Sequence, residues 1–204
     1  MSPKTRRKAS AFLDRVAWPL KLLYPASNGA GVDRFGPASC AIADRVAASK
    51  RSDSAKIIRN FIEDYHEKLE ENFLFPRFKK AGKLVDLVDV LMQQHQAGRK
   101  VTDITMQFAT NQALKNSDDR RKLVDSLRQF IRMYNPHEAR EDTVLFPEFR
   151  KIVNQNEYDS LGEDFEKKEH ELFGEDGFEK MVDKVAGIEK KLGIYDLAQF
   201  TPKI

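Results

Sequence analysis

The sequence has little cysteine, glycine and proline. Among 204 residues there are one cysteine, 10 glycines and 8 prolines, while 41% of the residues are hydrophobic and 33% are charged. This composition excludes a disordered or fibrous protein and permits a helical, globular one. The single cysteine, Cys40, cannot form a disulfide within the chain, and a chain of this length can bury a core without one. We therefore expect a cytoplasmic protein.

Long hydrophobic runs are also lacking. The longest stretches without a charged residue, 22–32 and 104–114, have 11 residues each, whereas a membrane-spanning helix needs roughly 20. The sequence therefore predicts no transmembrane helix and no membrane partner.

An excess of charge of one sign is found only at the start of the chain. The net charge is +3, and the first ten residues hold four basic residues and no acid. The remainder has 31 basic and 32 acidic residues, and their signs alternate along stretches such as 163–171, as on solvated helix faces. We therefore expect no nucleic-acid partner. The basic start also resembles a twin-arginine export signal, but charged residues interrupt the apolar stretch that follows it, which favours an arm leading to a short amphipathic segment.

Proline and glycine mark the organisation of the chain. They are frequent in residues 1–33, which we interpret as an N-terminal extension. Residues 34–193 are expected to form one helical domain, followed by a tail, 194–204. No period-two alternation is sustained, so the sequence predicts an all-α fold, an up-and-down four-helix bundle with extra C-terminal helices. The expected helices cover about 38–50, 53–81, 84–114, 117–153 (interrupted at Asn135-Pro136), 156–173 and 178–192.

An internal repeat is the most informative feature of the sequence. Residues 66–80 and 137–151 are identical at eight of fifteen positions, at an offset of 71. Each copy contains His-x-x-x-Glu, as His66 and Glu70 or as His137 and Glu141, followed by Leu-Phe-Pro. Residues four apart share a helix face, so each pair can point to one place. Two such helices packed together would join two histidines and two glutamates, as in dinuclear carboxylate sites of helical bundles.

The other two histidines extend this pattern. His95 follows His66 by 29 residues and His170 follows His137 by 33, each about one helical hairpin downstream. We expect His95 to be a ligand, and we leave His170 open between a ligand and a surface residue. Imidazole nitrogen and carboxylate oxygen together suit iron or manganese.

These motifs resemble the hemerythrin-like domains, also called HHE cation-binding domains, and in particular the bacterial members. The resemblance covers about residues 34–153. It implies a helical bundle with two metal ions, usually iron bridged by an oxo or hydroxo group. It also implies that the ligands are His66, Glu70, His95, His137 and Glu141, with the two glutamates as bridges.

The sequence departs from this family at two positions. Cys40 stands about where the family has its first-helix histidine, and Arg99 stands where oxygen carriers have a second histidine one turn after His95. Cys40 is either a small buried residue that has replaced the ligand or a thiolate ligand of one metal. In a third alternative, His170 completes the site.

Three classes of function follow. The first is a di-iron module that binds dioxygen, nitric oxide or peroxide for sensing, scavenging or detoxification. The second is an enzyme that disproportionates peroxide or oxidises iron, and the third is a metal-poor interaction domain. We expect the first, as a monomer or homodimer, with enzymatic activity left open.

Overall fold

The structure is a computed structural model that describes residues 52–193 and 195–202. Within these residues it contains helices, turns and no strand, which confirms the all-α prediction. The expected extension 1–33, the expected helix 38–50 and Cys40 lie outside the described residues.

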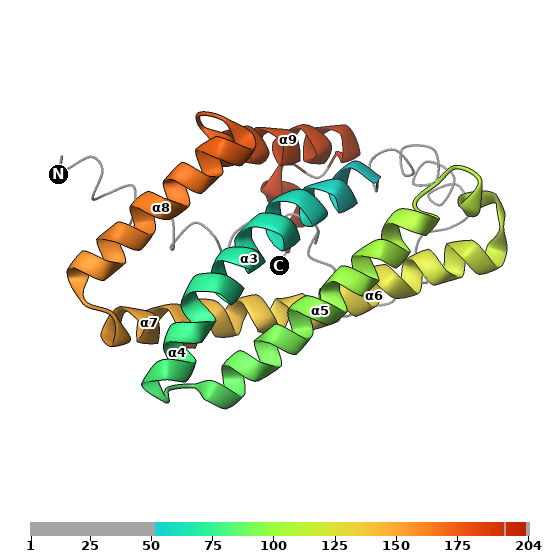
Figure 1. Cartoon of the computed structure of the whole chain (residues 1–204). Coiled ribbons are helices and arrows are strands. Elements are labelled where there is room, and N and C mark those ends of the chain that lie inside the picture. Colours follow the sequence, from blue (N-terminus) through green and yellow to red (C-terminus); the bar gives the residue numbers. More distant parts are fainter. Residues whose placement is uncertain (1–51, 194, 203–204) are drawn as a thin grey trace.

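The described chain is a series of long helices joined by short loops (Figure 1). The first runs without a break from residue 52 to Ala81 and alternates between α-helical and π-helical turns. After an α-helical start at 52–57, its segments are η3 (Ile58–His66, π), α3 (Glu67–Leu69), η4 (Glu70–Leu74, π) and α4 (Phe75–Ala81). The later elements are α5 (Val85–Phe108), the 3₁₀-helix η5 (Ala113–Lys115), α6 (Ser117–Arg140), η6 (Glu141–Leu145, π), α7 (Phe146–Ile152), α8 (Gln155–Phe173), α9 (Gly177–Leu192) and the 3₁₀-helix η7 (Leu197–Phe200).

Most helix boundaries agree with the sequence signals. Gly82 ends α4 in the left-handed region, at φ 63°, where glycine has no steric penalty. The Asn116 side chain caps α6 by accepting from two backbone N–H groups, and Asn154 caps α8 in the same way with one. The expected helix 84–114 ends earlier, at Phe108, because the chain turns there and the Thr110 hydroxyl accepts from the N–H of Ala113.

The expected interruption at Asn135-Pro136 is wrong. Helix α6 continues through Pro136 to Arg140. Proline removes one backbone hydrogen bond from a helix, but the turns on both sides of it are held by buried side chains, including Phe130, Tyr134 and His137. Packing of these side chains stabilises the helix beyond its local propensity.

Pro76 and Pro147 are expected to kink or end their helices, and neither helix ends there. Each proline lies in the first turn of an α-helix that follows a π-helical segment. In both copies the backbone N–H of the phenylalanine before the proline donates to the backbone carbonyl five residues earlier, which is that of Glu70 or Glu141. A π-turn widens the helix where the proline ring would otherwise clash with the preceding turn, so the helix can continue.

The helices pack around one hydrophobic core. Helices α5 and α6 lie side by side over much of their length, α4 contacts both α5 and α7, and α8 packs on α9 (Figure 1). The core contains the buried apolar side chains of the first helix between Ile58 and Leu69, together with aromatic residues of α4, α7 and α8. Among the largest fully buried side chains are Tyr65, Phe75, Phe78, Phe149 and Phe165.

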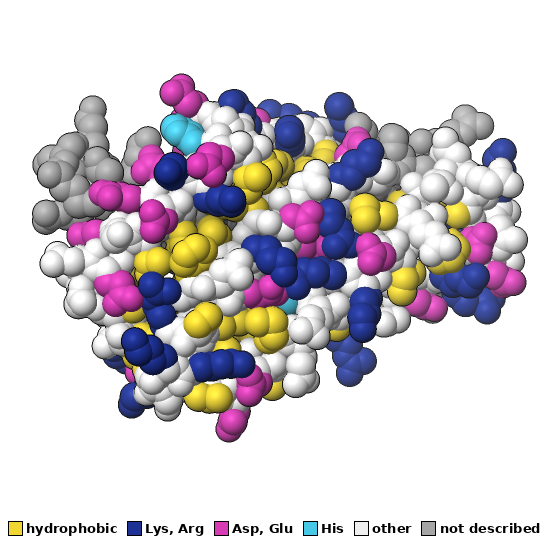
Figure 2. Space-filling model, viewed as in Figure 1, with side chains coloured by type: hydrophobic (Ala, Val, Ile, Leu, Met, Phe, Trp, Pro, Cys, Tyr) yellow, Lys and Arg dark blue, Asp and Glu magenta, His cyan; other side chains and the backbone are white. Residues whose placement is uncertain are grey.

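Charged side chains of both signs are intermixed over the face shown in Figure 2, around strips of hydrophobic side chains. This agrees with the balanced charge of the chain after its first ten residues. In the part of the chain that the structure describes, no helix is long and apolar enough to span a bilayer.

Candidate metal centre

Five predicted ligands meet inside the protein. His66 ends η3 and Glu70 begins η4, His95 lies in the middle of α5, His137 is near the end of α6, and Glu141 begins η6. These residues are between 0% and 6% exposed. The two π-helical segments that begin with the glutamates are separated by the repeat offset of 71. The repeat in the sequence is therefore a repeat in the backbone.

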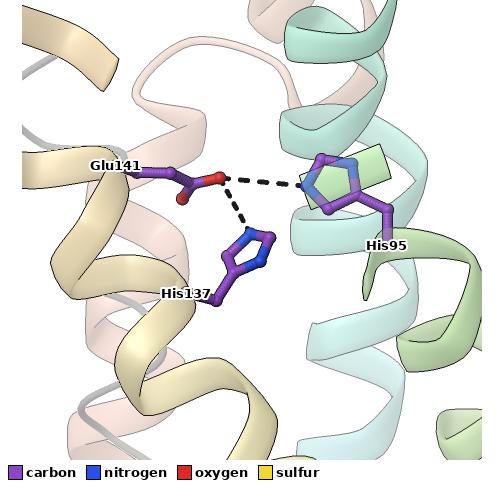
Figure 3. A group of neighbouring side chains, drawn as sticks. All are labelled: His95, His137 and Glu141. Carbon is purple, nitrogen blue, oxygen red and sulfur yellow. Dashed lines mark ion pairs between the residues drawn. The ribbon is translucent and has the colours of Figure 1, made fainter. Parts of the chain in front are cut away.

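The ring nitrogens and carboxylate oxygens of these residues face one another. His137 Nε2 is 2.8 Å from Glu141 Oε1, and His95 Nε2 is 3.9 Å from the same oxygen (Figure 3). His95 Nε2 is also 3.4 Å from Glu70 Oε2, which lies 3.7 Å from His66 Nε2. The five side chains therefore form one continuous cluster.

The cluster divides into two groups that share one carboxylate. His95, His137 and Glu141 offer ligand atoms within 4.8 Å of one another, and so do His66, Glu70 and Glu141. A carboxylate that belongs to both groups has the position of a bridge between two cations.

Unsatisfied polar atoms show that a cation fits this cluster. Within the described structure, both carboxylate oxygens of Glu70 and Nε2 of His95 are buried and make no hydrogen bond. A buried polar group without a partner costs about 1–3 kcal/mol, and more if it is charged. A metal ion among these atoms would replace the missing partners, and both ligand types are ones that iron, manganese and zinc accept.

The electrostatics of the cluster favour cation uptake. Burial, reinforced by the charge of Glu141, raises the pKa of Glu70 well above its usual value. Burial also lowers the pKa of His66 to about 3, which leaves its ring neutral and able to bind a metal. For His95, burial is outweighed by the neighbouring carboxylates of Glu141 and Glu71, which raise its pKa to about 10. A cation therefore competes with protons on Glu70 and His95.

The outer nitrogens of two rings have partners of their own. His95 Nδ1 lies 3.2 Å from Glu71 Oε1, and His137 Nδ1 lies 2.8 Å from Gln94 Oε1. Because each of these oxygens accepts a hydrogen bond from Nδ1–H, the Nε2 lone pair of each ring is left for a metal. The His95 ring also stacks on Phe75, with ring centroids 5.4 Å apart.

A layer of charged residues lies behind His95. Arg99 contacts Glu67 and Glu71, at 2.7 Å in both cases. Hydrogen bonds from His95, Lys68 and Arg99 outweigh burial and lower the pKa of Glu71 to about 2. Arg99 thus occupies the turn after His95 as the partner of two carboxylates.

Both tyrosines that precede ligand histidines are buried in the core, and both hydroxyls have acceptors. Tyr65 donates to the backbone carbonyl of Phe165, at 3.3 Å. Tyr134 donates to Glu67, the residue that Arg99 also holds. Tyr134 is therefore both a core residue and part of the layer behind the ligands.

His170 is not brought to the cluster. It lies exposed on α8, which buries Leu161 and Phe165 on its other face. It lines a shallow surface pocket with charged neighbours of the same helix, Glu163, Glu166, Lys167 and Glu171. This placement favours the surface interpretation of His170, and Cys40 lies outside the described residues.

Sequence reasoning did not find the residues behind the ligands, which are Glu63, Glu67, Glu71 and Gln94, and it did not find the ion-pairing role of Arg99. A signal was present, because Glu63, Glu67 and Glu71 recur every four residues and Arg99 follows His95 by four. Such spacing is also typical of solvated helix faces, and burial distinguishes the two cases: Glu63 and Glu67 are at most 1% exposed.

Gly98 leaves the space that Tyr134 occupies, and its replacement tests the contact. In Gly98→Ala the new Cβ would lie 2.5 Å from the Tyr134 hydroxyl oxygen, so Tyr134 must move away from Glu67. We expect a loss of about 1–3 kcal/mol in the free energy of unfolding, measured by urea denaturation. Gly187→Ala in α9 is the control, because a Cβ there meets nothing within 4 Å. It should gain up to about 1 kcal/mol from helix propensity, and equal effects of the two variants would contradict this account.

Glu63 should make stability depend on pH. It is fully buried, accepts from Thr102 and pairs with Arg59 at 3.0 Å. Burial nevertheless raises its pKa from 4.5 to about 7. The folded protein thus holds this proton more tightly than the unfolded chain, so the stabilisation is complete below pH 4.5 and is lost as the pH rises through 7.

The variant Glu63→Gln should remove this dependence. Between pH 4.5 and 8, the free energy of unfolding of the wild type should fall by about 3 kcal/mol relative to that of the variant. Denaturant titrations of the metal-free proteins at a series of pH values measure it. Glu148→Gln is the control, because Glu148 forms an exposed ion pair with Lys151. The wild type should not lose stability relative to this variant as the pH rises. A constant difference for Glu63→Gln would refute the assignment.

Comparisons with known proteins place the chain beside relatives without an assigned role. No family model matches the chain, and no solved structure matches it. The chain is 50% identical over 159 residues to uncharacterized proteins of Mycobacterium bovis and of two strains of Mycobacterium tuberculosis. The alignment covers 78% of this chain and 62% of each relative, so the chain spans about three fifths of the length of these proteins.

Proposed function

We propose that the chain is a hemerythrin-like protein with a non-haem di-iron centre that binds or reacts with dioxygen, nitric oxide or peroxide. The observation that supports this proposal is the sharing of Glu141 by two buried ligand groups, next to a Glu70 carboxylate without a hydrogen bond. Two cations bridged by these carboxylates would satisfy both groups at once.

The proposal also includes the finer architecture. The helix that ends with α4, helix α5, and the continuous helix of α6, η6 and α7 would be three helices of the up-and-down bundle. The expected helix 38–50 lies outside the described residues, and α8 and α9 would be the C-terminal additions. The contacts of α4 with α5 and α7, and of α5 with α6, support this arrangement.

Each ligand has a proposed role. His66, His95 and His137 would each bind one metal through Nε2, and Glu70 and Glu141 would bridge the two. When bound, a di-iron centre supplies the electrons and the open coordination positions for small oxidants. The chain fixes the ligand positions and, by burying them, keeps bulk water away from the centre. Iron is the metal that the resemblance implies, and manganese accepts the same ligands.

Metal content and absorption test the proposal directly. Protein purified without air should contain about two iron atoms per chain by elemental analysis, and near-ultraviolet bands should appear when air is admitted. Separate additions of nitric oxide and peroxide then distinguish a binding module, which changes its spectrum once, from an enzyme that turns over. A protein with at most one metal per chain would refute the dinuclear centre and favour the interaction-domain alternative.

Single replacements test which residues hold the metals. Glu141→Ala removes the ligand shared by both groups, so it should lose both metals, measured as iron per chain. His170→Ala is the matched control, because it changes an exposed histidine outside the cluster, and it should keep the wild-type iron content. Loss of iron in His170→Ala, or full retention in Glu141→Ala, would contradict the ligand assignment.

A further inference from the structure

The two histidines of the His95, His137 and Glu141 group have outer partners of different charge. His137 Nδ1 faces the neutral amide oxygen of Gln94, whereas His95 Nδ1 faces the carboxylate of Glu71. A carboxylate behind an imidazole fixes its orientation and makes it a stronger metal ligand than an amide does. The two rings are therefore not equivalent, although their helices face the same centre.

The Glu71 carboxylate is held in place from two other sides. Arg99 contacts the same oxygen that faces His95, at 2.7 Å, and Lys68 contacts the other, at 2.5 Å. The second arm of the Arg99 guanidinium binds Glu67 and the backbone carbonyl of Glu63. Because Arg99 is anchored to successive turns of one helix, Glu71 cannot leave His95 without breaking its ion pair with Arg99, which is largely removed from water, and its exposed ion pair with Lys68.

We propose that Glu71, fixed by Arg99, is the positioning residue of His95 and makes the His95, His137 and Glu141 group the first of the two metal positions to load. This inference rests on the proposed function and goes beyond it by ranking the two positions. It adds a role for Arg99, which stands one turn after His95 as the anchor of Glu71.

The number of nitrogen ligands supports the same order. The first position has two imidazoles with fixed outer partners, and Glu70 Oε2 lies only 3.4 Å from His95 Nε2. Among the described residues, the second position has one imidazole, His66, with the two carboxylates. Neutral imidazole is a strong ligand of first-row divalent metals, so the position with two preorganised rings binds more tightly.

Titration of the full-length, metal-free protein with Co²⁺ tests the proposal. Visible d–d absorption and calorimetry should resolve two steps in the wild type, with the tighter step first. Glu71→Gln should raise the dissociation constant of the first step about 10–100-fold and leave the second step little changed. Arg99→Gln should raise the first constant by a smaller factor. Glu148→Gln is the control, because it also removes a glutamate paired with a lysine three residues away.

A second measurement separates positioning from a general loss of structure. In Zn²⁺-loaded protein with ¹⁵N-labelled histidine, the Nδ1 proton of His95 should resonate downfield of that of His137, and this difference should disappear in Glu71→Gln. Equal first-step constants for wild type and Glu71→Gln, or an unchanged Nδ1 proton, would overturn this inference and leave the di-metal proposal intact. Failure of the wild type to bind two Co²⁺ ions would overturn both.

Discussion

Two buried carboxylates that share a contact with the same imidazole impose the main constraint on this structure. Glu70 and Glu141 are each 2% exposed, and both lie near His95 Nε2. Leaving water costs several kcal/mol for each charge, and without a cation the two compete for the few protons available to them. For Glu141, the neighbouring His137 and His95 rings outweigh burial and lower its pKa, while burial raises the pKa of Glu70. The metal-free protein therefore retains protons where a cation would place positive charge.

The surrounding charged residues follow from this constraint. Glu67 and Glu71 add further negative charge beside the cluster, and Arg99 compensates both. Tyr134 donates a further hydrogen bond to Glu67, and it reaches that carboxylate because residue 98 is glycine. A ligand cluster that is unfavourable by itself is thus embedded in a network in which most partners are satisfied, which is the condition for keeping ionised groups in a core.

Much of this arrangement could be predicted from the sequence. Helix boundaries at Gly82, Asn116 and Gly193 follow local rules, and the repeat in the sequence points to His66, Glu70, His137 and Glu141. The continuous α6 through Pro136 and the early end of α5 could not be predicted, because tertiary packing and one side-chain hydrogen bond decide them. The residues behind the ligands were missed for a related reason: a glutamate every four residues is the same pattern on a buried helix face and on a solvated one.

The repeat makes the two halves similar but not equal. In both copies a π-helical segment follows the ligand histidine and ends at the leucine of Leu-Phe-Pro, so each glutamate begins the widened turn in the same way. The residues after these glutamates differ: Glu71 bonds the His95 ring, whereas its repeat counterpart is Asp142, and His137 is instead held by Gln94. The repeated backbone thus builds a nearly symmetric pair of carboxylates. The two sides of this pair differ chemically because Glu71 bonds one histidine ring and Gln94 bonds the other. These unequal sides are the structural basis of the proposed order in which the two metal positions load.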